Sequence, residues 1–263
     1  MRYLHSRNRA ILREMVSTDF KVRYQSSVLG YIWSLLKPLF LFAILYVVFT
    51  YIIPLGKGVE HYPVYLLMGI VMWNFFVEST IIGAGSIVAR GDLIRKIRIP
   101  RYLIVVSSSF SALINLCLSL IVVFIFALFN GVAPSLGWLL IIPIVIELFV
   151  FAQGLSFLLS ALYVKFRDIT YIWEIMLQAG FYATPIIYPL MMVNPQYQNY
   201  FFINPVTQIV QDARYVVVTN TSTTIWSTVH SLAVFVPFII IITVAIVGGA
   251  YFKRHSKYFA EDI

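Results

Sequence analysis

Charged residues are scarce in this sequence. Of its 263 residues only 11% are Asp, Glu, Lys or Arg, whereas 60% are hydrophobic. A soluble domain carries roughly 25% charged residues, so most of this surface cannot face water. The composition therefore excludes an ordinary soluble domain and predicts an integral membrane protein, for which the bilayer is the solvent.

Cysteine is almost absent as well. Cys117 is the only one, which excludes a disulfide within the chain and a cysteine metal cluster. The four histidines are scattered without metal-ligand spacing, and a G-x-x-x-x-G-K-S/T phosphate loop is missing. We therefore predict no catalytic residue, no metal site and no cofactor bound by this chain.

Long uncharged runs predict the membrane spans. A helix needs roughly 20 apolar residues to cross about 30 Å of hydrocarbon. Residues 102–146, 175–211 and 215–252 contain no Asp, Glu, Lys or Arg, and the turn-rich stretch "NGVAPSLG" divides the first run. We predict an all-α integral membrane protein with six transmembrane helices, near residues 32–54, 62–86, 102–129, 138–164, 169–188 and 227–252.

The region between the fifth and sixth helices, residues 185–225, does not fit a plain span. It begins apolar, yet it holds Pro185, Pro189, Pro195 and Pro205. Proline breaks helices, and irregular backbone cannot face lipid. We predict short re-entrant or interfacial helices on the external side. A plain external loop is the alternative.

The distribution of Lys and Arg predicts the orientation. All but Lys57 and Arg214 lie at the chain ends, at the start of the first span, or in the links at residues 87–101 and 165–168. The positive-inside rule then places both termini and both links in the cytoplasm. This partition also accounts for the net charge of +8 without a nucleic-acid partner.

The cytoplasmic segments carry patterns beyond charge. Residues 4–24 have the spacing of an amphipathic helix lying in the membrane interface, so we treat 1–31 as an interface segment and 32–263 as the transmembrane domain. In the 87–101 link, Asp92 is placed to cap a short helix, and Pro100 ends it. The apolar face of that helix is predicted to hold Leu93, Ile94 and Ile97, and its basic face Arg95, Lys96 and Arg98.

Such a helix favours a docking or gating element over a loop that only fixes orientation. The second link, at 165–168, is a very short turn. It holds Lys165 and Arg167, followed by Asp168, which is predicted to be the N-cap of the next helix.

Polar residues inside the predicted spans are candidates for function. A carboxylate at bilayer depth costs roughly 2.5–3.5 kcal/mol, so Glu78 and Glu147 are expected to face protein or a water-filled path. A hydrogen-bonded structural glutamate is the alternative. Ala152, Ser156 and Ser160 form a stripe of small residues that permits close helix approach.

Arg214 is unlike the other basic residues because topology does not explain it. On the external side its guanidinium could bind carbonyls at a helix end, the carboxylate of Asp212, or a passing phosphate.

Five motifs occur in an order that resembles a known family. "VRYQSSVLGYIWSLLKP" at 22–38 is similar to the segment with which permeases of polysaccharide-exporting ABC transporters enter their first span; the matching residues are Arg23, Tyr24, Ser27, Leu29, Gly30, Trp33 and Pro38. The others are "LIRKIRIPR" at 93–101, "FRDI" at 166–169, "TPIIYP" at 184–189 and "NPVTQIVQDAR" at 204–214.

The resemblance implies a homodimeric permease of the O-antigen, capsule and teichoic-acid group in the bacterial inner membrane. Its substrate would be a polymer on a polyprenyl-diphosphate lipid. Its partners would be two copies of an ATP-binding subunit that uses ATP and Mg. The ATPase contacts would be Asp92, Leu93, Ile94, Arg95, Lys96, Ile97, Arg98, Pro100, Lys165, Arg167 and Asp168. The substrate path would include Arg9, Arg13, Arg23, Tyr24, Trp33, Glu147, Tyr182, Tyr188 and Arg214.

Three other functions are alternatives to polysaccharide export. A permease of the same fold could export a drug or another lipid. A membrane-embedded glycosyltransferase would need paired carboxylates or a catalytic loop, and an ion channel would need a filter or a charged ring. The sequence contains neither of these last two patterns.

Overall fold

A computed structural model of the chain describes residues 2–24, 32–53, 55–56, 58–97 and 99–259, and within these ranges the structure is helical without strands. In the first two helices some side chains are not described. The elements are α1 (Arg2–Tyr24), α2 (Ile32–Val47), the π-helical turn η1 (Val48–Ile52), α3 (Tyr62–Ala89), α4 (Gly91–Lys96), α5 (Tyr102–Phe129), η2 (Leu136–Leu140), α6 (Ile141–Lys165), α7 (Ile169–Ala183), η3 (Leu190–Met192), α8 (Pro195–Phe201), α9 (Pro205–Val217), α10 (Ile225–Thr228), η4 (Leu232–Phe235) and α11 (Val236–His255).

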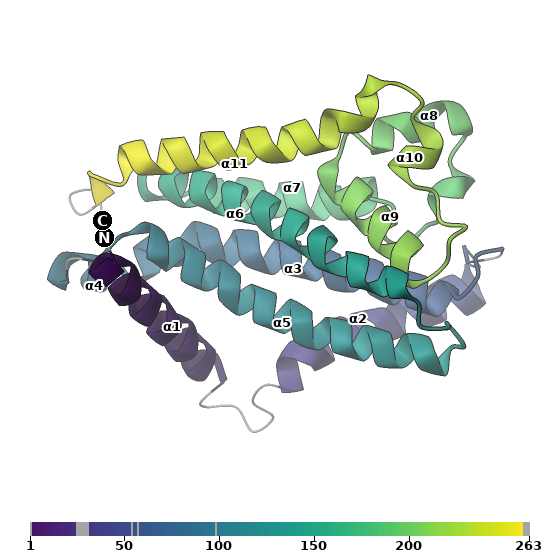
Figure 1. The fold of residues 1–263 in the computed structure, drawn as a ribbon, viewed down its shortest axis with the longest axis horizontal. Helices are drawn as coiled ribbons and strands as arrows, with labels where there is room; N and C mark the ends of the chain where they lie inside the picture. Colours follow the sequence, from purple (N-terminus) through teal and green to yellow (C-terminus); the bar gives the residue numbers. More distant parts are fainter. Residues whose placement is uncertain (1, 25–31, 54, 57, 98, 260–263) are drawn as a thin grey trace.

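The long helices α3, α5, α6 and α11 run along the long axis of the molecule (Figure 1). The start of α1, the short α4 and the end of α11 lie at one end, called here the α4 end. Helices α8, α9 and α10 gather at the opposite end, called here the α9 end (Figure 1). Helix α3 packs against both α5 and α6 and supplies much of the core.

Four segments are long and apolar enough to cross a membrane: Tyr62–Ala89, Tyr102–Phe129, Leu136–Lys165 and Leu232–His255. The chain is therefore a helical membrane protein with several spans. Two further predicted spans are shorter. The apolar stretch in the α2 region is Pro38–Ile52, and α7 has 15 residues, or about 22 Å of helix against about 30 Å of hydrocarbon.

Proline explains where the observed helices depart from the predicted ones. The fifth helix was predicted to reach residue 188 but ends at Ala183, because Thr184 precedes Pro185 and adopts an extended conformation. The sixth was predicted to start at 227. Instead, α10 ends at Thr228, and α11 begins at Val236 with Pro237 in its first turn. The bounds of the third, Tyr102–Phe129, match the prediction.

Small residues bring the long helices together, as the stripe on α6 predicted. Ala152, Ser156 and Ser160 are fully buried. The Ser156 hydroxyl donates to the Ser79 carbonyl on α3 at 3.1 Å. On the other side of α6, the backbone of Gly154 lies directly against Gly248 of α11. Such contacts substitute van der Waals packing for the hydrophobic force that lipid cannot supply.

Candidate functional site

At the α4 end, three helices meet at the side chain of Arg90. The guanidinium of Arg90, between α3 and α4, forms an ion pair with Asp19 of α1 and donates to the Ser107 hydroxyl of α5 at 3.0 Å. One side chain thus joins α1, the end of α3 and α5 immediately before α4. Sequence reasoning missed this junction because nothing in the local pattern pairs Asp19 with Arg90.

The short helix predicted in the first link is present as α4. Ile94 is 9% exposed and packs in a cluster with Ile104, Phe252 and Phe259. The prediction that Ile97 shares this face is wrong: the helix ends at Lys96, so Ile97 adopts an extended conformation and is 53% exposed.

The capping prediction for this helix is wrong as well. Arg90 occupies the N-cap position, and Asp92 lies in the first turn with its side chain exposed. Leu93 and Pro100 are half-buried, Arg95 and Lys96 are exposed, and Arg98 lies outside the described residues. Helix α4 is therefore anchored by Ile94 and presents charged groups outward, and the exposed Ile97 follows directly after it.

The 165–168 turn is also fully exposed. The Lys165 Nζ lies 5.4 Å from the ring of Phe166, and the Arg167 guanidinium 5.3 Å from the ring of Tyr163. Asp168 takes the predicted N-cap position of α7, but its side chain makes no capping hydrogen bond. The exposed side chains of the turn thus present charge at the α4 end, with each cation lying near an aromatic ring.

The amphipathic N-terminal helix is confirmed as α1, which packs against α5. Its apolar residue Met15 contacts the cluster around Ile94. Arg9 and Arg13 are exposed and line, with Phe110 of α5, an open cavity of about 380 Å³. The side chains of Arg23 and Tyr24 lie outside the described residues.

Helix α7 carries a polar and aromatic stripe. Tyr171, Glu174, Gln178 and Tyr182 recur at a spacing of three or four residues, which places them along one side of the helix. All four are exposed, and Leu177 is the buried residue of the described helix. Glu174 makes no ion pair with Arg167 in the described chain. A carboxylate and an amide on this apolar helix are poorly suited to face lipid.

At the α9 end, Arg214 is completely buried and holds three segments together. Its Nε donates to the Tyr65 carbonyl at 3.0 Å, its Nη1 to the Pro185 carbonyl at 2.5 Å and its Nη2 to the Ile186 carbonyl at 2.6 Å. These bonds join α9 to α3 and to the non-helical stretch after α7. The guanidinium also stacks 3.5 Å from the centre of the Tyr65 ring.

Of the three partners considered for Arg214, the carbonyls are the ones it binds. Asp212, two residues away, instead accepts from the Gln208 side-chain amide at 2.7 Å. Tyr62 reinforces the same place, because its hydroxyl donates to the Ile187 carbonyl at 2.8 Å. Tyr188 is half-buried, and its hydroxyl donates to the carbonyl of the exposed Tyr182.

Glu147 and Asp212 share a polar contact between α6 and α9. The Gln208 amide donates to both carboxylates, at 3.5 Å to Glu147 and 2.7 Å to Asp212. One oxygen of each of these three side chains is buried without a hydrogen-bond partner in the described structure. Burial raises the pKa of Asp212 to about 6, and the hydrogen bond from Gln208 lowers it only in part.

The other predicted site residues are less engaged. Trp33 is 49% exposed. Glu78 accepts from the Asn115 amide at 2.9 Å, which links α3 to α5 and fits its predicted contact with protein. Most of the predicted residues thus fall into four groups: the outward face of the α4 end, the cavity beside α1, the exposed stripe of α7, and the buried contacts of the α9 end.

The fold defines a class: a helical membrane protein with several spans, an amphipathic helix at its start and a tightly fastened group of short helices at one end. The sequence profile described as ABC-2 type transporter matches residues 12–218. The chain belongs to the ABC-2 type transporter family.

Three relatives show how far the likeness extends. An O-antigen export system permease protein RfbA of Klebsiella pneumoniae is 29% identical over 252 residues, which is 95% of this chain and 94% of that protein. A second RfbA of that species is 31% identical over 201 residues, 76% of this chain and 77% of that protein. The polysialic acid transport protein KpsM of Escherichia coli is 23% identical over 205 residues, 74% of this chain and 76% of that protein.

Proposed function

We propose that this chain is the membrane permease subunit of an ATP-driven exporter of a polyprenyl-diphosphate-linked polysaccharide. The single observation that carries the proposal is the likeness over 95% of this chain to a protein named as an O-antigen export permease. The likeness extends over nearly the whole length of both proteins and does not rest on one shared motif.

The proposed topology has six spans, with the α4 end in the cytoplasm and the α9 end outside. Helix α2 with η1 and helix α7 supply the two spans beyond the four long ones. The start of α1 and the end of α11 lie together with α4 (Figure 1), which supports an even number of crossings. Helices α8 and α9 form the external re-entrant region; ten residues of α9 are buried, as shielding of a broken element requires.

The stripe on α7 is the proposed wall of the export path. Two copies of the chain would face each other across it, because a homodimer can enclose a path that one copy leaves open on its side. Tyr171 and Tyr182 offer ring faces for sugars, and Glu174 and Gln178 offer polar atoms for hydroxyls. The proposed role of Glu174 is therefore to bind sugar hydroxyls, and not to form an ion pair with Arg167.

The outward face of the α4 end is the proposed dock for the ATP-binding subunit, one copy beneath each permease. The first link presents charge through Asp92, Arg95 and Lys96, and the exposed turn at 165–168 adds further charge. Ile97 and Phe166 are the two exposed apolar side chains of this surface. The buried Ile94 would transmit a push on α4 to the ends of α5 and α11, against which it packs.

The cavity beside α1 is the proposed approach for the lipid-linked head group. Arg9 and Arg13 attract a diphosphate, and the apolar wall around Phe110 suits the lipid part. Replacing both arginines with Gln is expected to lower export, whereas Lys21→Gln, an exposed position on the same helix outside this cavity, is expected to change it little.

Depletion of the chain tests the proposed function. We expect a lipid-linked glycan to accumulate on the cytoplasmic side and surface polysaccharide to fall. Export should return with the unchanged chain and be reduced with Glu174→Leu, whereas Met176→Leu, on the same helix, should restore it. Accumulation of no glycan, with loss of tolerance to a drug instead, would favour the drug-exporting alternative.

A further inference from the structure

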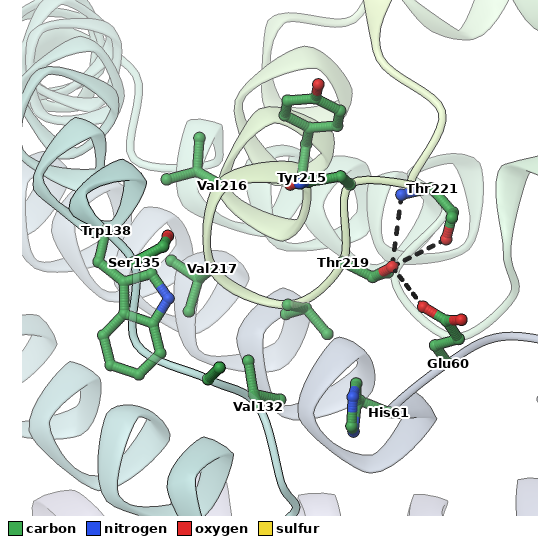
Figure 2. A pocket seen from close by; sticks show the side chains of 13 residues that line it. Glu60, His61, Val132, Ser135, Trp138, Tyr215, Val216, Val217, Thr219 and Thr221 are labelled. Carbon is green, nitrogen blue, oxygen red and sulfur yellow. Dashed lines mark hydrogen bonds between the residues drawn. The ribbon is translucent and has the colours of Figure 1, made fainter.

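Three segments far apart in sequence enclose a cavity of about 320 Å³ at the α9 end (Figure 2). They are the residues just before α3, the connection from α5 to α6, and the last turn of α9 with the residues after it. Small-molecule sites in proteins have volumes of about 300–1,000 Å³, so this cavity suits a compact ligand. None of the functions assigned above uses it.

One wall of the cavity is apolar and fixed. It is formed by Trp138 together with Val132 and Val217 (Figure 2). The indole of Trp138 stacks on Phe124, with ring centres 5.0 Å apart and planes inclined by 20°. Its Nε1–H makes no hydrogen bond in the described structure. The ring is therefore held in place while its donor is available to a ligand.

The opposite wall is a chain of hydrogen-bonding groups. The Thr219 hydroxyl donates to a Glu60 carboxylate oxygen at 3.0 Å and lies 2.8 Å from the hydroxyl of Thr221 (Figure 2). This network fixes the direction of the Glu60 carboxylate, which is exposed and keeps accepting capacity. Asn220 and Tyr215, both exposed, add an amide and a phenol to the rim.

Charge narrows the class of ligand. Among the described residues that line the cavity, Glu60 carries a carboxylate and none is Lys or Arg, so a phosphate or carboxylate ligand would be repelled. The polar wall and the small volume exclude a lipid chain. A neutral or amino-substituted pyranose fits both walls, because its C–H face packs on an indole while its hydroxyls bind a carboxylate, hydroxyls and an amide.

The backbone conformation of His61 also supports a binding site in this cavity. It is a non-glycine residue in the left-handed conformation, with φ 53° and ψ 38°, directly before α3. Such a backbone costs free energy and persists where its surroundings require it. The His61 ring forms the side of the cavity next to Glu60 (Figure 2).

We propose that this cavity, lined by Glu60, Trp138 and Thr219, is an external binding site for one or two pyranose units. The inference rests on the proposed function for its biological setting, because the outward orientation places the site where exported polysaccharide emerges. The sugar could come from that polymer or from free saccharide outside the cell.

Saturation-transfer NMR on the purified full chain in nanodiscs tests the site directly and requires no export. The probes are the methyl glycosides of glucose, galactose, mannose and N-acetylglucosamine, with sorbitol and methyl phosphate as controls. We expect transfer to the ring protons of at least one glycoside and none to the controls. Adding the delipidated surface polysaccharide of the host then separates the sources: competition assigns the site to the polymer, and no competition to free saccharide.

Variants tie the signal to this cavity. Glu60→Gln removes a charge-assisted hydrogen bond and should weaken binding about tenfold or more, and Trp138→Leu should abolish it. His61→Asn keeps a residue that tolerates the left-handed conformation and should weaken binding without loss of thermal stability. Trp226→Leu alters an exposed tryptophan at the same end, outside the cavity lining, and should leave binding unchanged.

Two outcomes would overturn the proposal. One is the absence of transfer to all four glycosides. The other is a signal that survives both Glu60→Gln and Trp138→Leu. Neither outcome bears on the export function, which the depletion experiment tests separately.

Discussion

Gly69 of α3 lies where Arg214 of α9 needs space. A methyl group on Gly69 would collide with the guanidinium Nη2, which donates to the Ile186 carbonyl. The absence of a side chain at one position therefore permits the buried cation at the other. Through this contact the α9 end is fastened to the central helix of the bundle.

Gly69→Ala should destabilise the chain by about 1–3 kcal/mol, because it forces the guanidinium away from its carbonyls. The expected fall in melting temperature is roughly 3–10 °C, measured by circular dichroism in nanodiscs. Gly85→Ala is the matched control on the same helix, since an added methyl there meets nothing within 4 Å. Equal behaviour of the two variants would mean that Arg214 has room to move.

Arg214→Lys and Arg214→Gln should both loosen the segment after α7. Lys keeps the charge but cannot reach the carbonyls of Tyr65, Pro185 and Ile186 at once, and Gln lacks the charge and most of the donors. With Cys117→Ser as background and Ile187→Cys as reporter, we expect faster external thiol labelling and lower export. Ile187 is 7% exposed in the intact chain.

The exposed Arg167→Gln serves as the control for charge and should leave labelling unchanged. If Arg214→Lys labels like the parent while Arg214→Gln does not, charge alone holds the segment and the fork-shaped contact is unnecessary.

Uncharged length and proline were the parts of the sequence that predicted the fold. The 102–129 helix was predicted residue for residue, because charged and turn-forming residues bound it on both sides. The same reasoning wrongly extended the predicted fifth span past Thr184, because "TPIIYP" is an apolar run. Pro185 disfavours a helical conformation at the preceding residue, so the helix ends before it.

Long-range pairs could not be predicted. The predicted topology marks Arg214 as unusual, because it is one of two basic residues on the external side. Its partners could not be predicted, because they are backbone carbonyls, which every residue has, and they belong to residues far away in the sequence. Arg90 was taken as one of many cytoplasmic cations, although its ion pair with Asp19 spans 71 positions. Charge counts place such residues on a side of the membrane without saying what they touch.

Gly248 and Gly249 are neighbours with opposite surroundings. A methyl group on Gly248 would collide with the Gly154 carbonyl of α6, whereas one on Gly249 meets nothing within 4 Å. Gly248→Ala should therefore separate α6 from α11 and cost about 1–3 kcal/mol. Gly249→Ala should be neutral or slightly stabilising, because alanine favours helix over glycine. Thermal unfolding of the two variants side by side distinguishes them, and equal melting would contradict the close approach.

The ion pair between Asp19 and Arg90 should hold α1 on the bundle. Both side chains are partly exposed, at 23% and 21%, so the pair is worth only about 1 kcal/mol. We expect Asp19→Ala to raise hydrogen exchange of the amides in α1 with a small effect on global stability. Arg90→Ala should act more strongly, because it also removes the hydrogen bond that the guanidinium donates to the Ser107 hydroxyl.

A double-mutant cycle between Asp19→Ala and Arg90→Ala measures the coupling. Glu14→Ala, an exposed carboxylate on the same helix, should not change exchange in α1. A coupling energy near zero would show that apolar contacts such as that of Met15 hold α1 by themselves.

Asp212 should make stability depend on pH near 6. Burial raises its pKa from 3.8 to about 6 in the folded chain. The folded state therefore binds the proton more tightly than the unfolded state between these two values. The contribution of Asp212 to the free energy of unfolding is therefore largest at low pH. It falls as the pH rises from about 4 to about 6 and is constant above that.

The chain should consequently melt several degrees higher at pH 5 than at pH 7.5, measured by circular dichroism in the same nanodiscs. Asp212→Asn keeps an acceptor for the Gln208 amide but cannot ionise, so it should lose the share of that difference that Asp212 contributes. Asp168→Asn removes an exposed carboxylate and should retain the full difference. An Asp212→Asn variant with the pH response of the parent would mean that the buried carboxylate is not the group that titrates.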